Sequence, residues 1–203
     1  MYHRLYLSIA VILFSIGSSY AQSNSNNQLI QHLEENLQNS RKFFSQNVFD
    51  SSKIILKRNL FDSLLFHADS EVSIVATESY TLAMQQLAAT AQFDSALLYG
   101  KKALSSKVLT PQKRCSVFNK LADICYRVGK YDEGISLAKQ AIAAANKYKV
   151  EDAKSMIFKS YQAMGLIAIE QSKYELAQKY LLYSLKVLGG KSDDPYTNLM
   201  AVG

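Results

Sequence analysis

One short pattern occurs three times in this chain and constrains its fold more than any other feature. In each copy an aromatic residue precedes an acidic one, and a small residue stands three positions after the aromatic. The copies read QFDSA, KYDEG and KYELA, with their aromatics at Phe93, Tyr131 and Tyr174. These aromatics are 38 and 43 residues apart. Recurrence at such a period is typical of an array of stacked helical units.

The residues around the second copy predict two helices joined by a short turn. Thr110 can cap the first helix, and Pro111 suits its first position. Gly129 can end this helix before Tyr131 opens the next, and a break this short makes the pair an antiparallel hairpin. The first and third copies repeat the design. The apolar residues that form one face of the first helix in the second copy are Val117, Phe118, Leu121, Ile124 and Cys125.

These hairpins resemble the tetratricopeptide repeat (TPR) family, whose units carry W-x2-L-G-x2-Y on the first helix and A-x3-F on the second. Small residues in this pattern let the paired helices approach closely. The resemblance implies an all-α, right-handed solenoid of antiparallel hairpins. The matching residues in chain order are Tyr80-x2-Ala83-Met84-x2-Leu87 with Ala96-x3-Gly100, Phe118-x2-Leu121-Ala122-x2-Cys125 with Gly134-x3-Ala138, and Tyr161-x2-Met164-Gly165-x2-Ala168 with Ala177-x3-Leu181.

The copies depart from the family pattern in several places. Met84 stands where a small residue is expected, which predicts a looser first hairpin. Cys125 and Ala168 replace a larger aromatic, and the motif proline is absent from its expected place. The spacing exceeds the family's period, and the residues near 147–155 predict extended helices instead of a long loop. Long repeats of this kind resemble the TPR regions of bacterial extracytoplasmic sensor and regulator proteins.

The repeat register divides the chain into segments. We expect TPR-like repeats at residues 70–108, 110–149 and 151–190. Residues 28–68 are expected to form an N-terminal helical hairpin or a degenerate repeat, with helices at Leu29–Phe44 and Ser51–His67 and a faint echo of the pattern at Phe61. Residues 22–27 are polar and low in complexity, which predicts a flexible leader.

Both ends of the sequence carry a signal of their own. Residues 1–21 combine a short basic start, a 12-residue, mostly apolar run and small residues before a cut after Ala21, which indicates a cleavable secretory signal peptide. The run is too short for a membrane span, and no later segment is apolar enough for one. We therefore expect a periplasmic or secreted protein. Residues 194–203, with Tyr196 and Leu199, resemble the start of a further repeat that is cut short.

Charge and cysteine content exclude several classes of function. The net charge is +6, but the basic residues are spread out, which argues against a nucleic-acid surface. Cys115 and Cys125 fall on one predicted helix, roughly 15 Å apart, so they cannot form a disulfide with each other. Cys125 is expected in the core, and Cys115 is expected to be partly exposed near the helix start.

The sequence contains no recognisable catalytic motif. His3, His32 and His67 stand in no metal-binding or triad spacing. The two consecutive glycines that begin at Gly189 are expected to end a helix and not to form a phosphate loop. We therefore expect neither an enzyme nor a bound cofactor or metal.

The resemblance places a binding groove on the first helix of each repeat. The residues expected on that face are Glu78, Thr81, Gln85, Ser116, Asn119, Asp123, Tyr126, Lys159, Gln162 and Leu166. Tyr126 is the expected anchor. The leading interpretation is a protein or peptide-binding module, either complete or as the sensor portion of a longer signalling protein. The alternatives are the substrate-recruiting part of a longer envelope enzyme and a truncated fragment without function.

Overall fold

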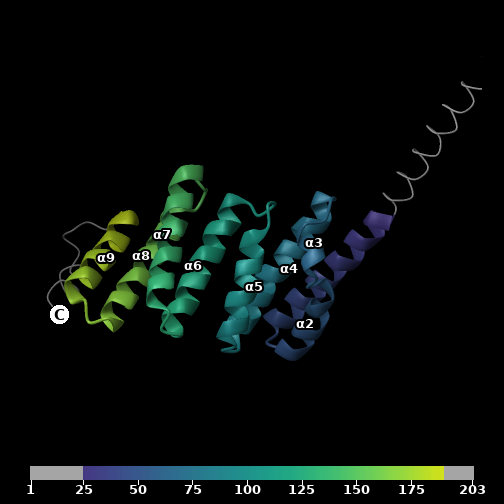
Figure 1. The fold of residues 1–203 in the computed structure, drawn as a ribbon, viewed down its shortest axis with the longest axis horizontal. Coiled ribbons are helices and arrows are strands. Elements are labelled where there is room, and N and C mark those ends of the chain that lie inside the picture. The colour runs from purple at the N-terminus through teal and green to yellow at the C-terminus, as the bar shows by residue number, and fades with distance from the viewer. Residues whose placement is uncertain (1–24, 190–203) are drawn as a thin grey trace, which may run out of the picture. The chain divides into compact units, whose positions relative to one another are not determined.

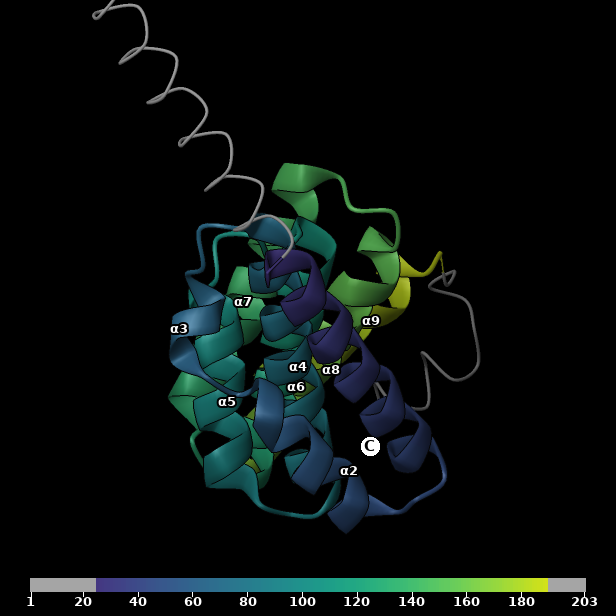
Figure 2. The same cartoon turned by 90° about the vertical axis from the view of Figure 1, so that its right-hand side faces the viewer.

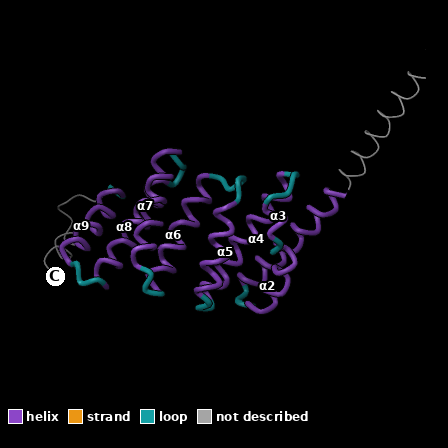
Figure 3. Tube along the Cα trace, viewed as in Figure 1, coloured by secondary structure: helices purple, strands orange, loops and turns teal. Residues whose placement is uncertain are grey.

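The computed structural model describes residues 25–189, and every regular element among them is a helix (Figure 1, Figure 3). The expected signal peptide and the expected partial repeat at 194–203 lie outside the described residues. The helices in chain order are residues 25–45, α2 (Phe49–Leu56), the 3-10 helix η1 (Lys57–Asn59), α3 (Asp62–Leu65), α4 (Ser70–Ala89), α5 (Phe93–Ser105), α6 (Pro111–Arg127), α7 (Tyr131–Tyr148), α8 (Ala153–Glu170) and α9 (Tyr174–Val187).

The chain divides into two compact units, with the boundary inside α4. Unit 1 ends at Ser79 and unit 2 begins at Tyr80. Unit 2 therefore contains the end of α4 and all of α5 to α9, and unit 1 contains the helices before them.

Unit 2 is a stack of helix pairs. α6 packs on α7 and α8 packs on α9, while α7 and α6 both contact α8 across the two pairs (Figure 1, Figure 2). Each pair is joined by only three residues, so its helices run antiparallel. The expected all-α fold of stacked antiparallel hairpins is confirmed. The longer spacing after the second copy comes mainly from α7, which has 18 residues where α5 has 13.

The three hairpin turns of unit 2 share one hydrogen-bonded geometry. Ala91, Gly129 and Ser172 each adopt a left-handed backbone at the end of the first helix. The next residue then donates its N–H to a carbonyl five positions earlier, as in Lys130 to Cys125 at 2.9 Å. This is the Schellman motif, which satisfies carbonyls that a helix end leaves open. The aromatic of the repeated pattern follows at once and begins the second helix.

Small residues hold the paired helices close together. A Cβ atom added to Gly165 would lie 2.7 Å from a methyl group of Leu181. A Cβ added to Gly100 would lie 2.7 Å from the sulfur of Met84, which is buried. The expected looseness around Met84 is therefore offset, because the missing side chain at Gly100 leaves room for it.

An apolar core runs through the hairpins of unit 2. Leu121, Ala122 and Ile124 are fully buried in it, together with Cys125. Cys115 is also fully buried, in a smaller cluster with residues from α7 and the α7–α8 link. The expectation that Cys115 is partly exposed is therefore wrong. It fails because the long α7 reaches the start of α6 and covers it.

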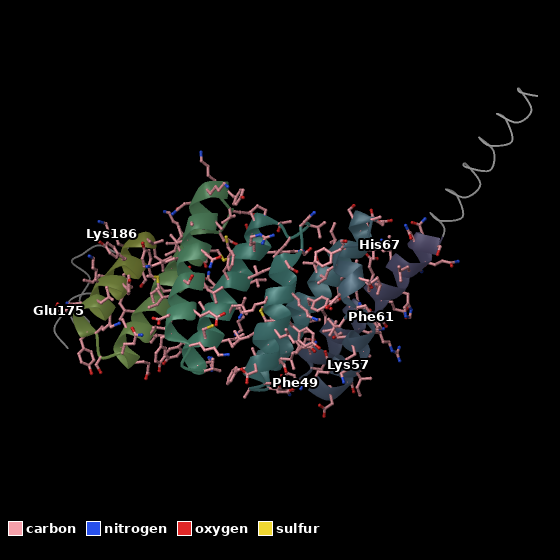
Figure 4. The ribbon with its side chains drawn as sticks, in the orientation of Figure 1. Phe49, Lys57, Phe61, His67, Glu175 and Lys186 are labelled. Carbon is pink, nitrogen blue, oxygen red and sulfur yellow. The ribbon has the colours of Figure 1, made fainter. Side chains whose placement is uncertain are left out.

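Unit 1 contains a fourth copy of the repeated pattern that differs from the expected one. Asn47 takes the left-handed turn position, Val48 donates to the carbonyl of Phe43 at 2.9 Å, and Phe49 begins α2. Phe49 and the following acid thus take the places of the pattern's aromatic and acid. Phe61, the faint echo seen in sequence, instead precedes the four-residue α3 with its side chain exposed (Figure 4).

Two further expectations for unit 1 need correction. The single helix expected at Ser51–His67 is three short pieces, α2, η1 and α3. Residues 25–27, expected in a flexible leader, belong to the first described helix, where the Asn26 amide donates to the Asp69 carboxylate at 3.2 Å. The breaks between α2, η1 and α3 leave less continuous apolar surface than one long helix would offer.

Buried polar side chains join the helices of unit 1. The hydroxyls of Ser40 and Ser52 lie 2.9 Å apart, at the same twelve-residue spacing as the small pair Gly165 and Ala177 in unit 2. The Asn36 amide donates to the Asn59 side-chain oxygen at 3.1 Å, and the Asn59 amide donates to the Leu33 carbonyl at 2.7 Å. These bonds satisfy groups that would be costly to bury alone.

Candidate functional site

The first helices of the second and third hairpins lie side by side and form the candidate site. α6 contacts α8 directly, without α7 between them. Seven of the residues predicted for the groove belong to these two helices. Ser116, Lys159, Gln162 and Leu166 are exposed there. We call the exposed side of α6 and α8 the first-helix face.

Asn119 of α6 is committed to packing. Its amide donates to the Met156 carbonyl at 2.9 Å, and the Ser160 hydroxyl donates to its side-chain oxygen at 2.6 Å. Both partners are on α8, and Ser160 is fully buried. Asn119 was predicted as a groove residue, but its amide N–H and oxygen already bind α8 and fix the spacing of α6 and α8. These are the groups with which it would bind a ligand.

The remaining groove residues of α6 carry charge and one aromatic ring. Asp123 lies between Lys120, at 3.5 Å, and Arg127, at 3.3 Å, both on its own helix. The Tyr126 hydroxyl donates to the Glu170 carboxylate of α8 at 3.4 Å. Partial burial and the Glu170 carboxylate raise the pKa of Tyr126. Tyr126 stays half-buried, so part of its ring is open to a partner.

Two apolar side chains on α8 give the first-helix face its strongest signal for binding. Leu166 is 41% exposed and Ile169 is 40% exposed, one turn apart on the same helix. Leu166 was among the predicted residues, and Ile169 was not. The spacing of Lys159, Gln162 and Leu166 could have extended to Ile169, since residues three and four apart share a helix face.

The three predicted residues of α4 are divided between the two units. Glu78 belongs to unit 1, where the Arg41 guanidinium contacts its carboxylate at 2.7 Å. Thr81 is half-buried and Gln85 is exposed, both in unit 2. The candidate site is accordingly built on α6 and α8.

A hollow lies on unit 2 among α7, α8 and α9. Its volume is about 340 Å³. The Tyr161 ring lies 6.3 Å from that of Tyr180 and 5.6 Å from that of Tyr183, measured between ring centroids. We call this hollow the tyrosine pocket; its lining is completed by Lys139, Ile142, Ala143 and Met164. Sequence reasoning named Tyr161 only as a motif residue of the third copy and did not single out the other two tyrosines.

The described residues offer little reactive chemistry. No group of three histidine, cysteine or acidic side chains within residues 25–189 could hold a metal ion. Both cysteines are free and buried. Burial raises the pKa of both thiols, that of Cys125 to about 11 with help from the Glu133 carboxylate. A nucleophilic cysteine needs the opposite shift.

None of the helices within residues 25–189 has both the length and the apolar content for a membrane span.

Comparison with known proteins gives a likeness of fold. No protein-family model matches the chain, and no curated protein matches it. A solved structure from the functional characterisation of PilF from Pseudomonas aeruginosa matches with a TM-score of 0.55 at 14% identity. The match covers 84% of this chain and 66% of that one, just under two thirds of its length. PilF has a TPR-type helical solenoid fold, so the fold of this chain is TPR-like.

Proposed function

We propose that this protein is a non-catalytic, protein-binding module that takes a protein or peptide on the first-helix face of α6 and α8. The observation that carries the proposal is the exposure of Leu166 and Ile169 beside the half-exposed Tyr126. Apolar and aromatic side chains at the centre of a polar surface are typical of interface anchors. The TPR-like fold supports this use, because arrays of helix hairpins present extended binding surfaces.

Charges around these anchors would guide the partner's orientation. Lys159 is exposed on α8, while Asp123 and Glu170 lie on α6 and α8 within the same face. Charges of both signs on one face favour a partner that is itself mixed in charge. Exposed charges of this kind add specificity more than affinity.

The proposal includes a location outside the cytoplasm, with residues 1–21 removed by a signal peptidase. Mass spectrometry of the purified natural protein tests this part by itself. An N-terminus at Gln22 is expected, and a mature chain that keeps Met1 to Ala21 would remove secretion from the proposal. The binding function stands or falls separately.

Selection of peptides from a displayed library on the purified protein tests the binding function. Leu166→Ser should lower the affinity for the selected peptides by about tenfold, since loss of a central apolar anchor costs more than about 1 kcal/mol of binding free energy. Leu98→Ser is the matched control, because Leu98 is 54% exposed on α5, outside the first-helix face. Equal loss in both variants, or no loss with Leu166→Ser, would refute the assignment to α6 and α8.

A further inference from the structure

The tyrosine pocket has the build of a site for one apolar side chain. Three tyrosine rings line it, and Ile142, Ala143 and Met164 complete an apolar lining. Its volume of about 340 Å³ lies at the lower end of the range for small-ligand sites. Tyr183 is 41% exposed, so the pocket opens to solvent beside an aromatic ring. Rigid aromatic surfaces of this kind bury much area for little loss of side-chain entropy.

The pocket is separate from the first-helix face. Tyr161 and Met164 line the pocket from α8, whereas Lys159, Gln162 and Leu166 belong to the first-helix face of the same helix. At 3.6 residues per turn, the two sets point roughly 160° apart around the α8 axis. A ligand in the pocket would therefore leave Leu166 uncovered, so the pocket and the first-helix face can bind separate ligands.

Two of the helices that border the pocket, α7 and α9, are basic where they pass it. Residues 134–150 of α7 and its end contain Lys139, Lys147 and Lys149 and no acidic residue. Residues 176–189 contain Lys179 and Lys186 and no acidic residue. The acid of α9, Glu175, is in its first turn, while Lys186 is near its other end (Figure 4).

The lysines nearest the tyrosines are open to a partner. Lys139 lines the pocket itself, and Lys179 and Lys186 lie within roughly 60° of Tyr183 around the α9 axis. All three are exposed, and none of them joins an ion pair with another described residue. The basic border therefore complements a negatively charged ligand.

We propose that the tyrosine pocket binds an acidic peptide segment that carries one aromatic or large aliphatic side chain. The apolar side chain enters the pocket against Tyr161, Tyr180 and Tyr183, and carboxylates on either side of it meet Lys139, Lys179 and Lys186. The apolar lining favours a peptide over a nucleic acid, because Tyr161 packs against both other rings and leaves no open row of ring faces for successive bases.

Fluorescence anisotropy with labelled synthetic peptides tests the proposal on the purified protein. The probe is GEEFEEG, compared with GQQFQQG, which lacks the charges, and GEEGEEG, which lacks the ring. We expect each comparison peptide to bind about tenfold more weakly than the probe, and added salt to weaken the probe most. Absence of measurable binding by GEEFEEG, or equal binding by all three peptides, would overturn the proposal.

Protein variants place the binding in the pocket. Tyr183→Ser should lower the affinity for GEEFEEG by about fivefold or more. The double variant Lys139→Gln with Lys179→Gln should lower it by a similar factor. Leu166→Ser should change nothing here, which separates this site from the first-helix face. Helix content and melting temperature of each variant check that it is folded. Unchanged binding in the folded Tyr183→Ser variant, or tighter binding of a ten-residue oligo-dT than of GEEFEEG, would also overturn the proposal.

Discussion

Unit 1 and unit 2 use the same helix-turn-helix element but hold it together by different chemistry. In unit 2 the paired helices meet at residues such as Ala122 and Gly134, and the core around them is apolar. In unit 1 the equivalent positions are Ser40 and Ser52, whose hydroxyls bond to each other and to backbone carbonyls. The small size of these residues is common to both units, and their polarity is not.

This difference shows which part of the repeat is a steric requirement. A serine, an alanine and a glycine all allow close approach, so the helix crossing survives the change. The serine hydroxyls, however, demand hydrogen-bond partners once buried. Stability in unit 1 should therefore depend on individual hydrogen bonds, and in unit 2 on packed volume.

The largest expected effect tests packed volume in unit 2. Leu121→Ala should lower the free energy of unfolding by about 3–4 kcal/mol, because Leu121 is fully buried and its loss leaves a cavity. Urea denaturation followed by circular dichroism measures it. Leu98→Ala, at an exposed site on α5, should cost under about 0.5 kcal/mol. Similar costs for both variants would mean that unit 2 does not depend on its apolar core.

The next effect tests the hydrogen bonds of unit 1. Asn59→Ala should cost about 2–3 kcal/mol, since it leaves the Asn36 amide and the Leu33 carbonyl without their buried partner. Hydrogen exchange should show the loss of protection in residues 25–59. Asn39→Ala is the control and should have little effect, because Asn39 is exposed on the helix of residues 25–45. If Asn59→Leu, which restores volume without polarity, were as stable as the natural chain, the comparison between the units would fail.

The smallest effect depends on pH and concerns the buried thiol of unit 2. Burial raises the pKa of Cys125 from 9.0 to about 11, so the folded state favours the neutral thiol. The contribution of this pKa shift to the free energy of unfolding is complete below pH 9. It is lost as the pH rises toward 11, and the loss reaches about 2 kcal/mol at pH 11. The measurement is the difference in unfolding free energy between the natural chain and Cys125→Ala from pH 8 to 11. A constant difference would show that folding does not raise the pKa of this thiol.

The repeat register was predictable from the sequence because its signals are local. Thr110, Pro111 and Gly129 mark the ends of α6 by their own backbone preferences, and the Thr110 hydroxyl accepts the Lys113 N–H at 3.3 Å as a cap should. The copy at Phe49 was missed because α2 ends at Leu56 after two turns and its small position is a polar serine. Periodicity of apolar residues cannot reveal a contact that hydrogen bonds make.

The candidate sites were less predictable, because they depend on where neighbouring helices come to lie. Asn119 reads as a surface residue until α8 places Ser160 and Met156 against its amide. The tyrosine pocket needs three helices at once. One signal was available: Tyr180 and Tyr183 take the places that Leu137 and Gln140 hold in the preceding copy. A residue that breaks the pattern between copies is a better guide to a site than one that keeps it.

The left-handed turn positions have a consequence for how this chain could be made more heat-resistant. Gly129 adopts its positive φ freely, but Ala91 and Ser172 hold φ values of 56° and 57° with a side chain attached. Each such residue costs about 1 kcal/mol relative to a relaxed backbone. The array thus keeps a reserve of strain in its loops, where glycine could release it without any change to the core or to either surface.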